Sequence, residues 1–200
     1  MPEWIVPPEK YLSPGDISKL LETCQKATDN AKLKGIQGPF RDNLIIRLAL
    51  GTGLRVYEIA NLKVDDLYLE NGENVLIVED KEGNWKRVVQ FSSRLGAMIL
   101  EYLKFREKDS TYLFPSQHRD RFSILGIQQL VNKWITRSGI SSHHSIMSLR
   151  HTHAIRLYKA SGHNIELVQK QLGHRIVLQS KINISTVDLE LSAALEKMGL

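Results

Sequence analysis

The stretch Ser148-Leu149-Arg150-His151-Thr152-His153-Ala154 does most to decide the fold of this chain, together with Gln171-Leu172-Gly173-His174 further along. The first stretch lies inside a helical pattern of apolar residues over 147–160, and the second closes a shorter helical pattern over 165–172. Glycine often ends a helix because it adopts the left-handed backbone conformation at little cost. The sequence therefore predicts two consecutive helices, one carrying Arg150 and the other ending before His174.

Other helices are predicted from the same periodicity and from their end signals. Ser13-Pro14-Gly15-Asp16 is typical of a helix start, because serine caps, proline fits the first turn and an acidic side chain favours the positive helix end. Gly139 and Gly162 are typical helix stops. A second helix is expected after a break at Gly35 to Pro39, with Leu44 on its inward face and its end at Gly51-Thr52-Gly53. Further helices are expected from Val56 to Leu62 and over 93–107, 124–138 and 187–197.

One part of the chain has the pattern of strands. The runs 74–78 and 85–91 are rich in β-branched residues, and a polar, glycine-containing segment separates them, which predicts a β-hairpin. The expected fold is mainly α with a small antiparallel β-sheet (α+β), formed by residues 13–200. Residues 1–12 hold three of the six prolines and are expected to be a linker or lead-in.

Composition narrows the class of protein only mildly. The chain of 200 residues is 42% hydrophobic and 24% charged, which suits one folded domain rather than a disordered chain. Its formal net charge of +5 is compatible with a polyanionic partner such as nucleic acid. A single cysteine, Cys24, excludes an intrachain disulfide framework. With neither a signal peptide nor a membrane-spanning stretch in the sequence, we expect a cytoplasmic protein with no membrane partner.

The two stretches quoted first resemble the tyrosine recombinases, also called phage integrases. In that family a Leu-Arg-His-Thr string carries the second active-site arginine, and a Leu-Gly-His motif precedes the nucleophilic tyrosine by about nine residues. The segment Gly51-Thr52-Gly53-Leu54-Arg55 resembles the family's first box, which carries the first arginine. The resemblance covers roughly residues 10–198 and implies the tyrosine-recombinase catalytic-domain fold.

The resemblance also implies roles for individual residues. Arg55 and Arg150 would hold a DNA phosphate, His174 would donate to one of its oxygens, and Lys81 in the hairpin turn would be the general acid. The turn has one extra residue before Arg87 relative to the family pattern, which leaves Lys86 as a rival to Lys81. The residues implied in DNA binding are Arg55, Lys81, Lys86, Arg87, Arg150, His151, His174 and Arg175. Family chemistry requires no metal and no cofactor.

Two positions depart from the family pattern. Asn183 lies nine residues after His174, where the tyrosine is expected, and an amide has no ionisable hydroxyl with which to attack a phosphodiester. Met147 stands three residues before Arg150, where the family has a histidine that handles protons. His143 and His144 would fall about two helical turns from Arg150 if the helix extended back to them, so we do not expect either to substitute.

Other hydroxyls are poor replacements for the missing nucleophile. All six tyrosines lie at or before Tyr158, too far along the chain for a small register slip to bring one in. Ser185 and Thr186 lie close to Asn183, but nothing obvious in the sequence activates them. The chain therefore resembles a recombinase that keeps its phosphate-binding residues and lacks its nucleophile.

Three functions remain open at this point. The chain could be a protein that binds double-stranded DNA without cleaving it, acting as a transcriptional regulator, an accessory factor or an inactive subunit. It could be an active site-specific recombinase whose tyrosine was replaced in this chain or is supplied by a partner recombinase. It could also be a decayed remnant of a mobile element. A homo-oligomer is possible in either of the first two cases.

The two ends of the chain carry further expectations from the resemblance. The family's separate N-terminal DNA-binding domain has no counterpart in this sequence, which fits a naturally short protein or a chain that begins at the linker. The segment from Val187 to Leu200 has an apolar face that could dock on a neighbouring subunit or pack on its own domain.

Overall fold

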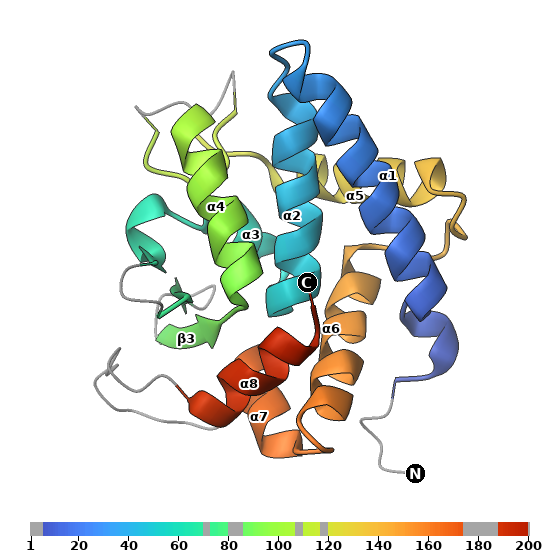
Figure 1. Cartoon of the computed structure of the whole chain (residues 1–200), viewed down its shortest axis with the longest axis vertical. Coiled ribbons are helices and arrows are strands. Elements are labelled where there is room, and N and C mark those ends of the chain that lie inside the picture. Colours follow the sequence, from blue (N-terminus) through green and yellow to red (C-terminus); the bar gives the residue numbers. More distant parts are fainter. Residues whose placement is uncertain are drawn as a thin grey trace.

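The computed structural model describes residues 6–69, 73–79, 86–106, 110–116, 120–173 and 188–199. Helices dominate it, and one small sheet lies to the side of them (Figure 1). The elements in chain order are η1 (Pro8–Lys10), α1 (Pro14–Lys32), α2 (Gly38–Thr52), α3 (Val56–Asn61), η2 (Val64–Asp66), β1 (Leu67–Tyr68), β2 (Val75–Glu79), β3 (Lys86–Gln90), α4 (Ser93–Phe105), α5 (Ile124–Arg137), α6 (Ile146–Ala160), α7 (Ile165–Leu172) and α8 (Leu189–Lys197).

Helix α2 forms the centre of the domain. It is buried along nearly its whole length and packs against α1, α4, α5 and α6. Figure 1 shows α2 standing between α4 on one side and α1 on the other. Leu44, Ile45 and Leu48 are fully buried, and the polar side chains of Asn43 and Thr52 are buried as well, so other elements enclose the helix on all sides. The end of α2 at Gly53 therefore delivers the next turn, with Arg55, to a fixed place.

The predicted hairpin is confirmed, and a third strand extends it. β2 and β3 pair antiparallel, with Val78 opposite Arg87, and β1 pairs antiparallel with the other edge of β2. β1 was not predicted, because its two residues are too short for any alternating pattern. Since β3 contacts α7 and α8, the sheet is joined to the helices of the C-terminal half.

The predicted helix ends agree closely with the structure. The Ser13 side chain accepts from the backbone N–H of Asp16 at the start of α1, as expected for its cap. α7 spans the eight residues predicted. Gly53, Gly139 and Gly162 follow α2, α5 and α6 with φ between 66° and 69°, the left-handed conformation in which glycine is favoured.

The last residue of the predicted lead-in belongs to the core. Leu12 is buried, and its backbone N–H donates to Thr152 Oγ1 over 2.9 Å. This bond ties the segment before α1 directly to α6. The segment is thus attached to the helix that carries Arg150.

Helix α8 packs on its own domain, against α6 and β3. Leu191, Ala194 and Leu195 are buried there, and the Gln90 side chain donates to the Asp188 carbonyl over 3.2 Å. The C-terminal apolar face was expected either to dock on a neighbouring subunit or to pack on its own domain. In the single chain it packs on its own domain. No helix in the described part of the chain is long and apolar enough to cross a membrane.

Candidate active site

The buried carboxylate of Glu58 organises the site. Glu58 lies in the first turn of α3 and accepts from the backbone N–H of Arg55 over 2.7 Å. This bond satisfies an N–H that the helix itself leaves without a partner, as in a capping box. The Arg55 guanidinium lies 3.5 Å from the same carboxylate, and its side chain remains 34% exposed. Glu58 thus fixes both the backbone and the side chain of the first predicted arginine.

Arg87, on β3, is the main partner of Glu58. Its guanidinium donates to both carboxylate oxygens, over 2.6 and 3.1 Å, and its Nε donates to the Gln171 carbonyl over 3.3 Å. The Arg87 side chain is only 8% exposed. A direct contact between Arg87 and DNA was predicted from the sequence and stays a prediction, and in the single chain the side chain points away from solvent. Arg87 joins α3, β3 and the end of α7.

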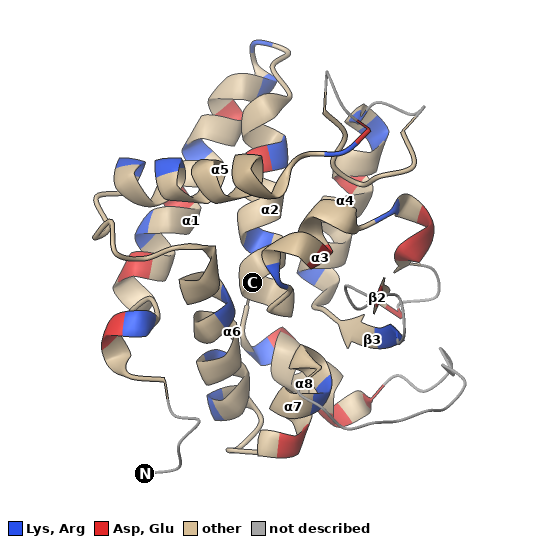
Figure 2. Ribbon diagram, turned by 180° about the vertical axis from the view of Figure 1, so that it is seen from behind, with Lys and Arg blue, Asp and Glu red and all other residues tan. Residues whose placement is uncertain are grey.

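Arg150, on α6, points into the same region. It donates to the Gly53 carbonyl and, over 2.9 Å, to the Leu172 carbonyl, and it lies 4.0 Å from Glu58 Oε2. The structure therefore brings together the two predicted active-site arginines, from α6 and from the turn before α3. Figure 2 shows α3, α6, α7 and β3 gathered on the face seen there, with basic residues on α6 and β3.

The charges in this cluster are not balanced. Among the described residues, Arg55, Arg87 and Arg150 each lie within 4.0 Å of the single carboxylate of Glu58. The pKa of Arg150 is lowered to about 10, first by burial and then by the charges of Arg55 and Arg87, against the opposing effect of Glu58. Burial would raise the pKa of Glu58, but the bonds from Arg87 and Arg55 outweigh it and keep the pKa below its usual value. A cluster with excess buried positive charge favours an anion beside it.

The end of α7 is built around these arginines. Gly173 follows the helix with φ 68°, and a Cβ at this position would lie 2.7 Å from Cδ of Arg87. Arg87 and Arg150 hold the last two carbonyls of the helix, which have no partner within it. The residues that follow, including His174, Arg175 and Asn183, lie outside the described residues, as does Lys81 in the hairpin turn.

Lys86, the predicted rival of Lys81, begins β3 and faces solvent. It forms an ion pair with Glu79 of the neighbouring strand, and both side chains are about half exposed. The pKa of Lys86 is raised, first by its hydrogen bond with Glu79 and then by the charge of that carboxylate. Along β3, Lys86 points outward and Arg87 inward, as the alternation of a strand requires. In this arrangement Lys86 is held by Glu79, away from the Glu58 cluster.

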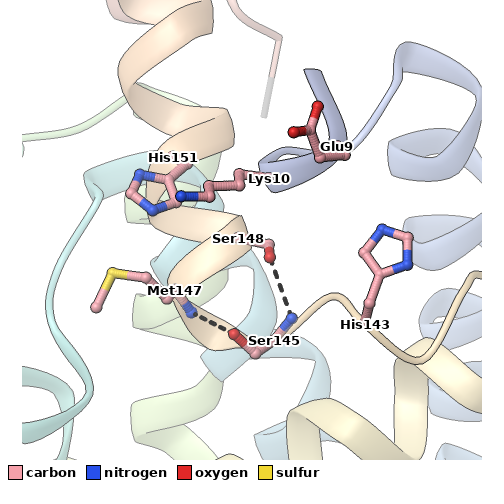
Figure 3. Close-up of a pocket in the computed structure, with 7 residues that line it drawn as sticks. All are labelled: Glu9, Lys10, His143, Ser145, Met147, Ser148 and His151. Atoms are coloured by element: carbon pink, nitrogen blue, oxygen red, sulfur yellow. Dashed lines mark hydrogen bonds between the residues drawn. The ribbon is translucent and has the colours of Figure 1, made fainter. Parts of the chain in front are cut away.

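Met147 and His151 lie one helical turn apart near the start of α6. Met147 is 50% exposed, and both residues line a cavity that also includes His143 (Figure 3). The helix does not extend back to His143, because α6 begins at Ile146, and the preceding loop brings His143 to the same cavity as Met147. That His143 does not substitute for the missing histidine stays a prediction. His144 is buried and does not line this cavity.

Sequence reasoning assigned no role to two residues that hold the site together. The first is Glu58, three residues after Arg55 in the chain. Gln171 is fully buried, and its side chain bonds to both the N–H and the carbonyl of Gln90, over 3.1 and 2.7 Å. It thereby attaches α7 to β3. No local pattern marks such a glutamine, because its partner is 81 residues away in sequence.

Among the described residues, no group of three or more His, Cys, Asp or Glu side chains is placed to hold a metal ion. The chemistry of the cluster described above is that of guanidinium groups, whose fork of N–H donors matches phosphate oxygens.

Fold and site together define a catalytic domain of the integrase type. The sequence model of the phage integrase family matches residues 10–182, and the chain belongs to this family. The matched span ends one residue before Asn183.

Relatives and solved structures agree with this assignment. The chain is 33% identical over 195 residues to the tyrosine recombinase XerA of Pyrococcus horikoshii, covering 96% of this chain and 66% of the relative. It is 36% identical over 175 residues to the tyrosine recombinase XerC of Caldanaerobacter subterraneus subsp. tengcongensis, covering 84% and 48%. The chain thus spans about half to two thirds of the length of these relatives.

Two crystal structures have the same fold. That of XerA recombinase superposes with a TM-score of 0.69 at 25% identity, covering 99% of this chain and 65% of that one. That of the XerH site-specific recombinase bound to its difH substrate superposes with a TM-score of 0.68 at 25% identity, covering 90% and 50%. The mainly helical fold with a small antiparallel sheet is therefore confirmed.

Proposed function

We propose that this protein binds double-stranded DNA through the recombinase surface and does not cleave DNA by itself. The observation that carries the proposal is the cluster of Arg55, Arg87 and Arg150 around one buried carboxylate, in a chain whose residue 183 has no hydroxyl. Such a cluster suits a phosphodiester, because it presents fixed donors and net positive charge without reorganising.

Arg150 and Arg55 have different parts in phosphate binding. The carbonyls of Gly53 and Leu172 account for two of the five N–H donors of Arg150, so the guanidinium is oriented by the protein and keeps donors for a phosphate. Arg55 is the more exposed of the pair and makes its contact with Glu58 from the edge of the cluster. Arg87 holds Glu58 in place and acts as a positioning residue.

The relatives support DNA as the partner. XerH was solved bound to its difH substrate in a pre-cleavage complex, and lambda integrase residues 75–356 were solved as a dimer bound to a core site. We extend DNA binding from these proteins to this chain, and we propose that it too assembles on DNA, with a second copy or with a partner recombinase. We propose a cytoplasmic location for the protein, because it would need access to DNA.

Strand cleavage requires a group that this chain lacks at the expected position. The arginines can neutralise the charge that develops on a phosphate under attack, but the attack itself needs a nucleophilic oxygen. Asn183 supplies none, and Met147 cannot carry a proton to or from a nucleophile. Phosphate contacts of this kind position a protein on DNA without reading its sequence.

The second candidate is an active recombinase. Its nucleophile would be a tyrosine supplied by a partner subunit, or a tyrosine at position 183 that asparagine replaces in this chain. The observation that favours this candidate is that Arg55 and Arg150 lie beside the same carboxylate, where their N–H donors can stabilise the charge on a phosphate under attack. A regulator of transcription is the third possibility, and it shares the DNA-binding surface with the first. The identity of the bound sites separates these functions.

The first experiment is therefore selection of bound fragments from the source genome, followed by a cleavage assay on a nicked duplex carrying the selected site. We expect the wild-type chain to bind and to form no covalent adduct. Asn183→Tyr together with Met147→His should produce a 3′-phosphotyrosyl adduct, whereas Asn183→Phe with the same second change should not. An adduct formed by the wild-type chain alone would overturn the proposal, and one formed only with a tyrosine-bearing partner would establish the second candidate.

A further inference from the structure

A cavity of about 460 Å³ lies between the segment before α1 and the start of α6. Lys10 of η1, His143 of the loop before α6, and His151 of α6 bring basic groups to it, and Glu9 supplies a carboxylate. Figure 3 shows Lys10 extending toward His151 across the top of the cavity, with His143 on the far side and Met147 pointing away from His143. None of these features is required by the Glu58 cluster.

The electrostatics of this cavity favour an anion. The pKa of His151 is lowered, first by burial and then by the positive charges of Arg150 and Lys10. Arg150 and Lys10 are therefore each close enough to His151 to disfavour its charged form, and a negative group beside the imidazole would offset their effect. The positive end of α6, a helix of 15 residues, is directed to the same place, with Ser145 as its cap.

The cavity also presents hydrogen-bonding groups suited to oxygen atoms. Nδ1 of His143 is engaged with Ser141 Oγ over 2.6 Å, which directs the Nε2 edge of the ring to a different partner. The Ser145 N–H donates to Ser148 Oγ over 3.2 Å, and the hydroxyl proton of Ser148 can point to a ligand. An ammonium group, two imidazoles and a serine hydroxyl can donate to phosphate oxygens, and the carboxylate of Glu9 is the one acidic group among the described residues that line the cavity.

The cavity is open rather than enclosed. Small-molecule sites usually bury most of the surface of their ligand, and this cavity is too open to the solvent for that. An open basic cavity instead suits a phosphate that is part of a strand passing over the surface. Its place beside Arg150 puts it next to the phosphate that the arginine cluster would hold.

We propose that this cavity receives a backbone phosphate of bound duplex DNA, adjacent to the phosphate held by Arg55 and Arg150. The proposal rests on the DNA-binding function above. It gives the segment before α1 a direct part in binding, through Lys10, and it assigns His143 and His151 to the same phosphate. Met147, half exposed beside them, would lie between the two phosphate positions.

The first test compares two lysine-to-alanine changes in duplex binding over a salt series. Lys10→Ala should weaken binding roughly tenfold and lower the slope of log Kd against log salt by about one, because one phosphate contact is lost. Lys34→Ala, an equal change of charge on an exposed residue beyond the other end of α1, should alter neither quantity. Equal binding by the two variants would overturn the proposal.

The second test follows the ring protons of His143 and His151 by NMR. Duplex DNA should shift both signals in the wild-type chain, and these shifts should shrink in the Lys10→Ala variant. Inorganic phosphate is the comparison, and shifts of equal size at a phosphate concentration no higher than that of the DNA phosphates would overturn a site for a DNA strand. Unmoved signals with DNA bound would also overturn it.

These outcomes separate the cavity from the proposed function. If the wild-type chain binds no duplex at low salt, the DNA-binding function itself fails, and the cavity proposal fails with it. If the wild-type chain binds DNA and Lys10→Ala behaves like Lys34→Ala, the function stands and only the cavity proposal fails. Thermal unfolding of both variants checks that neither change acts through the fold.

Discussion

The guanidinium of Arg87 donates to both carboxylate oxygens of Glu58, over 2.6 and 3.1 Å, and the two side chains are almost completely shielded from solvent. A buried carboxylate needs such a partner, because removing it from water without one is costly. The pair connects β3 to α3, and through the Arg55 backbone it fixes the turn that carries the first arginine. Packing in the sheet and geometry in the site thus depend on the same contact.

Arg87→Met should destabilise the protein by about 3 kcal/mol, since it leaves Glu58 buried without its main partner. Urea unfolding measures this loss. Changing both residues, in Arg87→Met with Glu58→Met, should recover a large part of it, because no uncompensated charge then remains. A loss below about 1 kcal/mol in the single variant would mean that Arg55 and Arg150 neutralise Glu58 unaided.

Gly173→Ala should cost about 2 kcal/mol or more, for two reasons. Its backbone has φ 68°, which disfavours alanine, and the new Cβ would lie 2.7 Å from Cδ of Arg87. Gly139→Ala is the matched control, since φ there is 66° and a Cβ would meet nothing within 4 Å. It should cost about 1 kcal/mol. Equal losses in thermal unfolding would show that the contact with Arg87 contributes nothing.

His153 should make the protein less stable in mild acid. It is fully buried, its Nδ1 lies 2.9 Å from the Leu50 carbonyl, and burial lowers its pKa from 6.5 to about 4. The unfolded chain therefore binds a proton that the folded chain excludes, and stability falls as pH decreases from about 6.5 to about 4. The loss is at most about 3 kcal/mol.

The measurement is urea unfolding at several pH values for the wild-type chain and for His153→Gln. The variant should be less stable near neutral pH but should show a shallower decline across this window. His163→Gln, at an exposed position, is the comparison. Parallel curves for the wild-type chain and His153→Gln would contradict the assignment of the effect to His153.

Leu12→Ala should destabilise the domain by about 2–4 kcal/mol, because Leu12 is buried in the core. Leu33→Ala removes the same atoms from a side chain that is 88% exposed and should change stability by less than about 0.5 kcal/mol. Differential scanning calorimetry distinguishes the two. Similar small effects would show that the segment before α1 contributes little to the stability of the domain.

The sequence predicted the helices and the hairpin well because their signals are local. The cap at Ser13 and the glycines after α2, α5 and α6 act within one or two turns. β1 could not be predicted, because its two residues form a strand only by pairing with β2. The third strand is therefore a product of the tertiary fold.

Only part of the site could be predicted, because only some of its residues lie in local sequence motifs. Arg55 and Arg150 were found through motifs, and the structure brings them to one carboxylate. The inward direction of Arg87 could not be found, since arginine is usually exposed and only the packing of β3 against α7 turns it inward. The position of His143 depended on where α6 begins, which is the least certain part of a helix prediction.

Arg150 also has a structural role, because it donates a hydrogen bond to the Leu172 carbonyl at the end of α7. Natural selection acting on folding alone would therefore retain this arginine, even in a lineage that had given up strand exchange. The presence of Arg150 in a chain with Asn183 therefore does not by itself indicate an earlier catalytic activity. A family member can therefore lose its nucleophile through one substitution that leaves the fold intact. Replacing the arginine would also remove the hydrogen bond that holds the end of α7.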